Sequence, residues 1–219
     1  MCGIVGYIGS KQAAPFLLDG MSKLEYRGYD SAGIAVLEKG QVRVEKCVGR
    51  LDALRQKLEG NMPESVIGVG HTRWATHGRP SDRNSHPHTD GSGKFVVVHN
   101  GIIENYLALK EELIAKGVEF SSDTDTEVVA HLMADLFDGD MESTVKKVLK
   151  VIKGSYSLVF MCEAEQDKII CTKKDNPLVI GLGEGENFIA SDIPAIINHT
   201  RRTFIMSDGE IATVTKDGV

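Results

Sequence analysis

Short strand-like runs follow one another directly in two parts of this chain, and this order limits the folds that it can adopt. Alternating apolar residues predict strands at 32–37 and 42–48, and six more between 156 and 214. Further strands are predicted at 3–8, 66–71 and 94–99, and helices at 13–24, 51–58, 105–116, 126–136 and 142–152. Consecutive strands favour antiparallel pairing over a doubly wound parallel sheet. The sequence therefore indicates an α+β fold with two stacked sheets covered by helices.

Composition excludes several classes of protein. The chain has 219 residues, 42% of them hydrophobic, which suits one large domain. Its net charge is −6 and its basic residues are dispersed, so we expect no nucleic-acid partner. No apolar run approaches the roughly 20 residues that span a bilayer, and the start does not match a signal peptide. We therefore expect a cytoplasmic protein with no membrane contact.

The four cysteines are widely and irregularly spaced, so no disulfide framework or Cys-x-x-Cys metal pair is predicted. Cys47, Cys162 and Cys171 lie in strand-like segments and are interpreted as core thiols. Cys2 directly follows Met1, so removal of Met1 would place a thiol and a free α-amine on one residue. An α-amine with a pKa of about 7.7 to 8.0 can serve as the base for that thiol. The alternative is that Cys2 is a small hydrophobic residue that opens a buried strand.

Two polar segments suggest further functional residues. At 24–33 a predicted helix ends in Arg27 and Gly28. Gly28 as a helix-terminating residue with a favourably placed Arg27 would explain the pattern, but Arg27 is also able to reach a site beneath the first strand. At 70–80 the only tryptophan, Trp74, follows Arg73 in a loop rich in glycine and proline. An arginine fork can hold a carboxylate while a neighbouring lid excludes water.

A metal site is the alternative for the second of these segments. Five of the seven histidines lie in or near it: His71, His77, His86, His88 and His99. Their spacing matches no recognised zinc pattern, so we expect neither a metal nor another cofactor.

Two more segments combine structural and functional explanations. Asn100-Gly101 follows an apolar strand, which is a common hairpin signal, yet the Asn amide and the next backbone N–H also converge as an oxyanion hole. The segment 121–127 is typical of a helix N-cap, which explains one Asp or Thr but not two. The extra carboxylate is suited to binding a substrate ammonium group.

These segments resemble one family over essentially the whole chain. The matching strings are MCGIVG at 1–6, EYRGYDSAG at 25–33, GHTRWATHG at 70–78, HNGIIEN at 99–105 and TDTE at 124–127. They are similar to the glutaminase domain of glucosamine-6-phosphate synthases, which are class II, N-terminal-nucleophile glutamine amidotransferases. The resemblance implies a four-layer αββα sandwich of two mainly antiparallel sheets between helical layers.

The resemblance also implies a role for each matching residue. Cys2 would attack the carboxamide of L-glutamine, with its own α-amine as base, and form a γ-glutamyl thioester. Asn100 and Gly101 would stabilise the oxyanion, and Arg27 would organise the nucleophile. Substrate binding would fall to Arg73, Trp74, Thr76, His77 and Asp125, whereas Asp123 is interpreted as a capping residue.

Residues 1–219 are expected to form one type 2 glutamine amidotransferase domain. The family's C-terminal sugar isomerase half would be absent from this chain and would be its partner domain in the full-length protein. The full-length enzyme is expected to be a homo-oligomer. There the ammonia would convert fructose 6-phosphate to glucosamine 6-phosphate. A precursor that retains Met1 would be inactive, so processing is expected. The alternatives are a domain that serves another ammonia acceptor and a module that binds glutamine without turnover.

Overall fold

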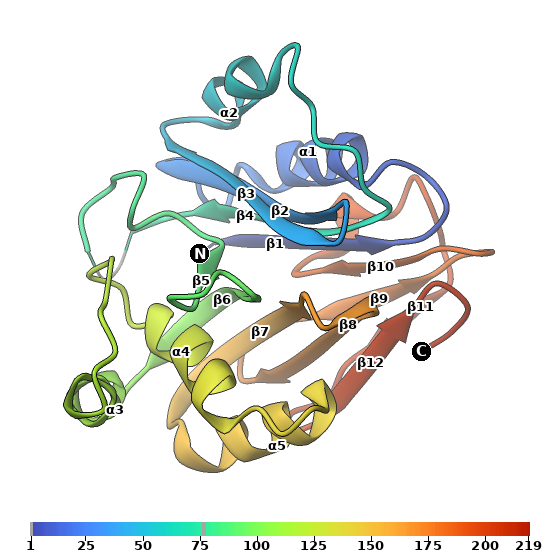
Figure 1. The fold of residues 1–219 in the computed structure, drawn as a ribbon. Helices are drawn as coiled ribbons and strands as arrows, with labels where there is room; N and C mark the ends of the chain where they lie inside the picture. The colour runs from blue at the N-terminus through green and yellow to red at the C-terminus, as the bar shows by residue number, and fades with distance from the viewer. Residues whose placement is uncertain (1, 76–77) are drawn as a thin grey trace.

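Two β-sheets stack face to face in the middle of the molecule (Figure 1). The computed structural model describes residues 2–75 and 78–219. In that part of the chain one sheet has seven strands and the other five, and every named strand pair is antiparallel. The predicted antiparallel α+β fold is therefore confirmed.

The seven-stranded sheet has β1 near its middle. Its order is β11-β9-β10-β1-β4-β2-β3, with bounds Thr203–Ile205, Val179–Leu182, Asn187–Ala190, Gly3–Ile8, Ile67–Arg73, Ser31–Glu38 and Gln41–Val48. The five-stranded sheet has the order β12-β8-β7-β6-β5, with bounds Ile211–Thr215, Glu165–Lys174, Gly154–Cys162, Phe95–Ile103 and His88–Thr89. A short 3-10 helix, η1 (Ile193–Ala195), follows β10.

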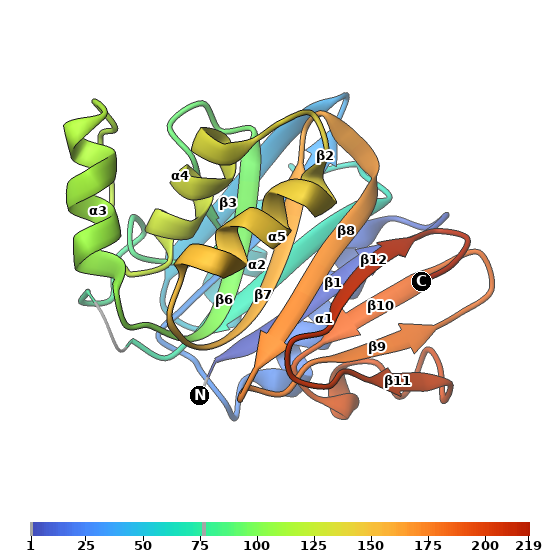
Figure 2. The ribbon, with the colours of Figure 1, turned by 90° about the horizontal axis from the view of Figure 1, so that it is seen from below.

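Helices cover the outer faces of both sheets (Figure 2). On the seven-stranded sheet these are α1 (Ala13–Leu24) and α2 (Leu51–Leu58). On the other side they are α4 (Glu127–Leu136) and α5 (Met141–Val151), with α3 (Tyr106–Ala115) packed beside α4. Together these layers form the αββα sandwich. None of the helices in the described ranges is long and apolar enough to cross a membrane.

Alternation along the strands divides the core into three layers. In β1, Val5 and Tyr7 face α1, whereas Ile4 and Ile8 pack between the sheets against residues such as Val98 of β6. A strand buried on both faces has its backbone fixed by hydrogen bonds and its side chains by close packing. The start of β1 is therefore a rigid place from which to present Cys2.

The cysteines beyond Cys2 are free thiols. Cys162 and Cys171 are buried in the core, and Cys47 is half-buried and packs against it, so the predicted core location is confirmed.

The largest difference from the predicted elements is in β6. The strand does not end at His99 but runs through Asn100 and Gly101, which pair with Ser157 and Tyr156 of β7. The interpretation of Asn100-Gly101 as a hairpin turn is therefore wrong. Gly101 is required for the close pairing, because its φ is +126° and an added Cβ would lie 2.0 Å from the Ser155 carbonyl oxygen.

Gly154→Ala should strongly destabilise the pairing of β6 with β7. Gly154 has φ +126°, and an added Cβ would lie 2.1 Å from Ile102 O. Because only glycine readily adopts this conformation, we expect a loss of about 3 kcal/mol, or about 6 to 12 °C in Tm for a chain of this size. The measurement is thermal unfolding followed by circular dichroism.

Gly93→Ala is the matched control. Gly93 also has a positive φ, +75°, but no atom lies within 4 Å of an added Cβ. Its cost should be only the left-handed strain of about 1 to 2 kcal/mol. Equal losses of Tm in the two variants would show that the contact with Ile102 O does not matter.

Candidate active site

Cys2 lies immediately before β1, where the first residues of β1 pair with the last residues of β4. Its Sγ accepts a hydrogen bond from the backbone N–H of Trp74 at 3.2 Å and lies 3.5 Å from Trp74 O. Burial raises the pKa of the Cys2 thiol, against the opposing effects of the Trp74 N–H and the nearby Arg73 charge. The thiol is therefore protonated at neutral pH and requires a base to become a nucleophile.

Asn100 approaches Cys2 from the other sheet. Its side-chain Nδ2 donates a hydrogen bond to Cys2 O at 2.9 Å. A carboxamide nitrogen carries two hydrogens, so this bond occupies only one of the two donors. The structure thus places a polar donor beside the cysteine, at the junction of the two sheets.

Arg73 and Asp125 bring opposite charges to the same region although both are buried, with 3% and 4% exposure. Burial lowers the pKa of the Arg73 guanidinium, and the charges of Asp30 and Asp125 act in the opposite direction. Arg73 Nη2 donates to Gly78 O at 2.9 Å, and Asp125 Oδ2 accepts from the Ile103 N–H at 2.8 Å. The other oxygen of Asp125, Oδ1, accepts no hydrogen bond from residues 2–75 and 78–219.

These side chains line one cavity of about 390 Å³, a size that suits a small metabolite. Seven of the nine predicted site residues lie on it: Cys2, Arg27, Arg73, Trp74, Asn100, Gly101 and Asp125. The other two, Thr76 and His77, lie outside the described residues, as does Met1. The lining also includes residues that the sequence did not predict as site residues: His86, His99, Ile102, Thr124, Thr126, Ser155, Asn176 and Pro177. Of these, the sequence indicates His86 and His99 only as alternative metal ligands, and His99, Ile102, Thr124 and Thr126 lie within the matching strings. Ser155, Asn176 and Pro177 lie in ordinary strand and turn segments, and only the pairing of β6 with β7 brings Ser155 to the site.

Arg27 is held at the cavity by Asp192, which the sequence did not indicate. Arg27 Nη2 and Tyr26 Oη both donate to Asp192 Oδ2 at 2.5 Å. Gly28 is not a helix-terminating residue, because α1 has its C-cap at Glu25. An added Cβ at Gly28 would lie 2.7 Å from the carbonyl carbon of Arg73, so this glycine permits close approach to the end of β4.

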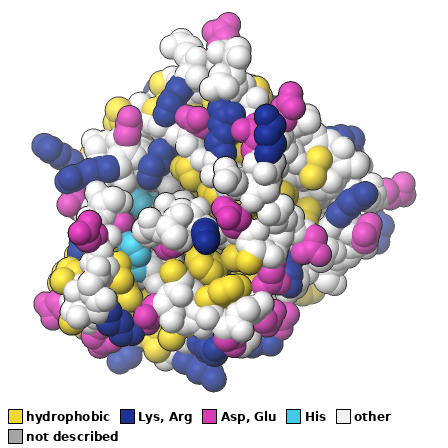
Figure 3. Space-filling view, in the orientation of Figure 1, with side chains coloured by type: hydrophobic (Ala, Val, Ile, Leu, Met, Phe, Trp, Pro, Cys, Tyr) yellow, Lys and Arg dark blue, Asp and Glu magenta, His cyan; other side chains and the backbone are white. Residues whose placement is uncertain are grey.

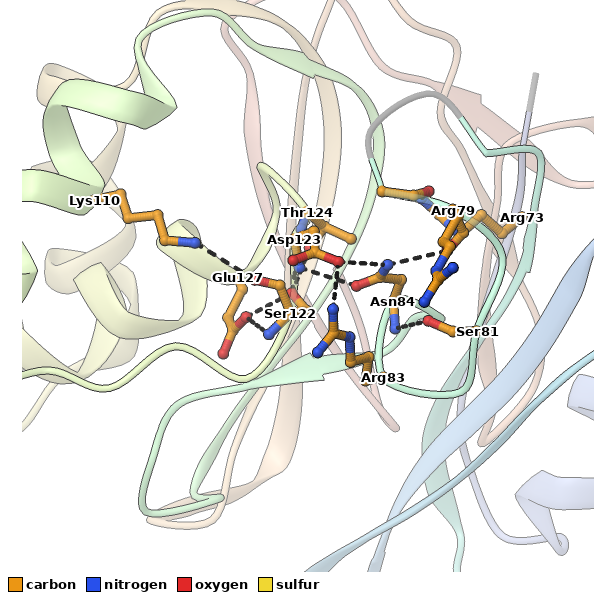
Figure 4. A network of polar contacts seen from close by, with 11 residues as sticks. Arg73, Arg79, Ser81, Arg83, Asn84, Lys110, Ser122, Asp123, Thr124 and Glu127 are labelled. Carbon is orange, nitrogen blue, oxygen red and sulfur yellow. Dashed lines mark hydrogen bonds and ion pairs between the residues drawn. The ribbon is translucent and has the colours of Figure 1, made fainter.

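The segment before α4 differs from the predicted N-cap (Figure 4). Asp123 is not a capping residue: its carboxylate accepts from Arg83 Nη2 at 2.8 Å and Asn84 Nδ2 at 3.2 Å. Asn84 Nδ2 also donates to Arg79 O at 3.0 Å, which ties the chain after the undescribed residues to this segment. The N-cap residue is Thr126, which makes no side-chain capping bond.

Glu127, in the first turn of α4, binds the segment that precedes the helix. Its carboxylate accepts from the N–H groups of Ser121 and Ser122 at 2.7 and 2.6 Å. Burial raises the pKa of Glu127, but hydrogen bonds from His131 and from both serines outweigh burial, so the pKa lies below its usual value. The carboxylate fixes the turn that presents Asp125 to the cavity.

Trp74 stands at the mouth of the cavity with 49% of its surface exposed. Its ring contacts Tyr29 edge-on, with centroids 5.5 Å apart, and the next residue, Ala75, donates its N–H to Asp30 Oδ2. An exposed aromatic pair held in this way can cover a bound molecule.

His71, His86, His88 and His99 form a buried group, and two of them, His86 and His99, line the cavity. The His71 and His86 rings stack with centroids 4.2 Å apart, and His88 meets His86 edge-on at 4.6 Å. His86 Nε2 and His99 Nδ1 both lie 2.9 Å from Thr126 Oγ1. Within the described ranges no three His, Cys, Asp or Glu side chains are grouped so that they could hold a metal ion.

Comparison with known proteins identifies similar sequences. The sequence profile described as a glutamine amidotransferase domain matches residues 71–198. The glutamine–fructose-6-phosphate aminotransferase (isomerizing) of Caldanaerobacter subterraneus subsp. tengcongensis is 57% identical over all of this chain and 36% of its own length. The Clostridium tetani protein of the same name is 54% identical over the same shares. The chain thus spans about a third of the length of these relatives, and the predicted family resemblance is confirmed.

Solved structures show the same fold. The glutamine phosphoribosylpyrophosphate amidotransferase of B. subtilis, in complex with ADP and GMP, superimposes with a TM-score of 0.79 at 25% identity. The superposition covers 99% of this chain and 49% of the chain in that structure. A structure described as the allosteric regulatory enzyme of purine biosynthesis gives a TM-score of 0.80, also at 25% identity and with the same coverage.

The buried histidines should make folding stability depend on pH. Burial lowers the pKa of His71 to about 3 and those of His86 and His88 well below 6.5. Each would titrate near 6.5 when unfolded, so the unfolded chain binds up to three protons that the folded chain does not. This contribution to stability is present above pH 6.5 and is lost as the pH falls. We expect the free energy of unfolding to fall by on the order of 5 kcal/mol between pH 7 and pH 5.

Urea denaturation at pH 8, 7, 6 and 5 would measure this loss. The curve should be nearly flat above pH 7 and steep below 6.5. Glu127, whose pKa is lowered, adds its own loss only below about pH 4.5 and so does not enter this window. Constant stability from pH 7 to pH 5 would contradict the neutral, buried state of the three imidazoles.

Proposed function

The chain belongs to the glutamine amidotransferase domain family, and from this we propose that it hydrolyses L-glutamine to glutamate and ammonia through a γ-glutamyl thioester on Cys2. The observation that carries the proposal is the meeting of Cys2 and Asn100, 2.9 Å apart at Cys2 O, in a cavity that also presents Arg73 and Asp125. This arrangement combines a nucleophile, an oxyanion donor and two charges that complement an amino acid.

The reaction begins with proton transfer. Once Met1 is removed, the α-amine of Cys2 accepts the thiol proton, and Sγ bonds to the side-chain carbonyl carbon of glutamine. The carbonyl oxygen becomes an oxyanion that accepts hydrogen bonds from Asn100 Nδ2 and the Gly101 N–H. The α-ammonium then gives its proton to the leaving nitrogen, the C–N bond breaks, and ammonia departs. Water attacks the thioester by the reverse sequence and releases glutamate and the free thiol.

Substrate binding uses the two buried charges. Arg73 pairs with the α-carboxylate of glutamine, and Oδ1 of Asp125 accepts from its α-ammonium. Trp74, with Thr76 and His77, closes over the bound substrate and excludes water. Arg27, fixed by Asp192, organises the nucleophile end of the site.

A further domain of the full-length protein would use the ammonia. Relatives named glutamine–fructose-6-phosphate aminotransferase are nearly three times as long as this chain. We infer that residues 1–219 form one glutaminase domain, that a sugar isomerase domain is its partner, and that ammonia is delivered there to fructose 6-phosphate to make glucosamine 6-phosphate. We further propose that the full-length enzyme is a cytoplasmic homo-oligomer. Another ammonia acceptor is not favoured, because relatives from many bacteria carry the same name.

Cys2→Ala and Asn100→Ala test the chemistry. With Met1 removed and the first residue confirmed by mass spectrometry, the wild type should release ammonia from L-glutamine. Cys2→Ala should abolish release, and Asn100→Ala should lower kcat by about 100- to 1000-fold, because an oxyanion donor acts mainly in the transition state. A processed wild type that leaves glutamine intact would refute the proposed function.

Arg73→Ala tests the binding of the substrate carboxylate. Loss of a hydrogen bond to a charged group costs about 1.5 to 3 kcal/mol, so KM for glutamine should rise by about 10- to 100-fold. Arg55→Ala is the control, because Arg55 lies on α2 and does not line the cavity. The KM of this variant should equal that of the wild type. An unchanged KM in Arg73→Ala would refute the assignment.

A further inference from the structure

The orientation of the Asn100 carboxamide is set by a histidine that none of the roles above includes. His71 Nε2 lies 3.0 Å from Asn100 Oδ1 and also 3.0 Å from the backbone oxygen of His99. A backbone carbonyl oxygen only accepts hydrogen bonds, so Nε2 must carry the hydrogen. His71 is therefore the Nε2–H tautomer, and it donates to both oxygens.

The contact at the other end of the Asn100 carboxamide independently fixes the same amide orientation. The Asn100 atom that faces Cys2 O lies 2.9 Å from a second backbone carbonyl, so it must be the nitrogen. Rotating the amide by 180° would oppose Nδ2–H₂ to the Nε2–H of His71 and Oδ1 to Cys2 O. The backbone oxygens of His99 and Cys2 can only accept hydrogen bonds, so together they fix the histidine tautomer and the amide orientation.

The surroundings of His71 disfavour the other tautomer. His71 is fully buried, and its Nδ1 has no hydrogen-bond partner among residues 2–75 and 78–219. A hydrogen on Nδ1 would be a buried, unsatisfied donor, which costs about 1 to 3 kcal/mol. The stacked His86 ring and the pairing of β4 with β1 and β2 hold the imidazole in place. Burial also lowers the pKa of His71 to about 3, so the ring is neutral at working pH.

We propose that His71 is a positioning residue for the glutaminase reaction: its Nε2–H holds the Asn100 carboxamide so that one Nδ2 hydrogen binds Cys2 O and the other faces the substrate oxyanion. Asn100 belongs to the five-stranded sheet, whereas His71 belongs to the seven-stranded sheet and Cys2 directly precedes its strand β1. His71 therefore aligns a donor from one sheet with a nucleophile from the other. This inference rests on the proposed function above.

Steady-state kinetics of Met-processed protein test the proposal. His71→Phe keeps a planar ring but removes the donor, and kcat for glutamine hydrolysis should fall by about 10- to 100-fold with KM changed less than about threefold. His71→Gln, whose amide can donate to the same two oxygens, should recover most of the lost rate. His199→Phe is the control, because the His199 ring packs against Phe16 and Phe188 and does not line the cavity. Its kcat should stay within about threefold of the wild type.

A double-mutant cycle separates positioning from a general structural effect. If His71 acts through Asn100, His71→Phe should cost no further rate in an Asn100→Ala background. An equal fractional loss in both backgrounds would overturn the proposal. So would a wild-type kcat in His71→Phe alongside a large loss in Asn100→Ala. If the processed wild type releases no ammonia, the proposed function fails instead.

The tautomer can be measured without any reference to activity. Long-range ¹H–¹⁵N NMR of the imidazole at pH 7 should report His71 as neutral with the hydrogen on Nε2. A hydrogen on Nδ1 would overturn the proposal even if every variant folded and the enzyme were active. Because this measurement uses the wild type, it also decides the case in which His71→Phe does not fold.

Discussion

The hydrogen bond between Asn100 Nδ2 and Cys2 O joins two sheets, and the site depends on the way these sheets stack. β1 and β6 face one another across an apolar layer in which side chains such as Ile4 and Val98 are fully buried. Close packing fixes the offset between the sheets to within a fraction of a side chain. A polar contact at the end of that layer is therefore held by the whole core, and the proposed nucleophile and oxyanion donor are aligned without a ligand.

The site is stabilised by burying polar groups that are individually costly. These groups include the stacked His71 and His86, Thr126 between His86 and His99, and the carboxylate of Glu127 with its serine donors. Each of these side chains makes at least one hydrogen bond to another polar atom, and the low dielectric then makes the geometry rigid. The same burial keeps the imidazoles neutral and so links the stability of the fold to pH. Stability and catalytic geometry thus come from one network.

Sequence patterns predicted much of this structure, because hydrophobic periodicity is local. The bounds of β1, α1 and α2 agree with the predicted runs, and antiparallel pairing follows from the order of the strands. The segment at Asn100-Gly101 was ambiguous because a turn and a strand with a strained glycine have the same sequence signal; only pairing with β7 distinguishes them. Asp123 was misassigned because its partner, Arg83, is distant in sequence. Asp192 and His71 were missed for the same reason, since their roles exist only in the folded chain.

The two sheets bring a cysteine and a carboxamide together, and we propose that this pair makes the domain a covalent catalyst for glutamine hydrolysis. Rapid acid quenching of the Met-processed protein during turnover, followed by peptide mass spectrometry, tests this most directly. We predict one added γ-glutamyl group on the peptide that begins with Cys2, more abundant when hydrolysis of the thioester is slowed. Turnover with no acyl group on Cys2, or an acyl group on Cys47 instead, would contradict the account.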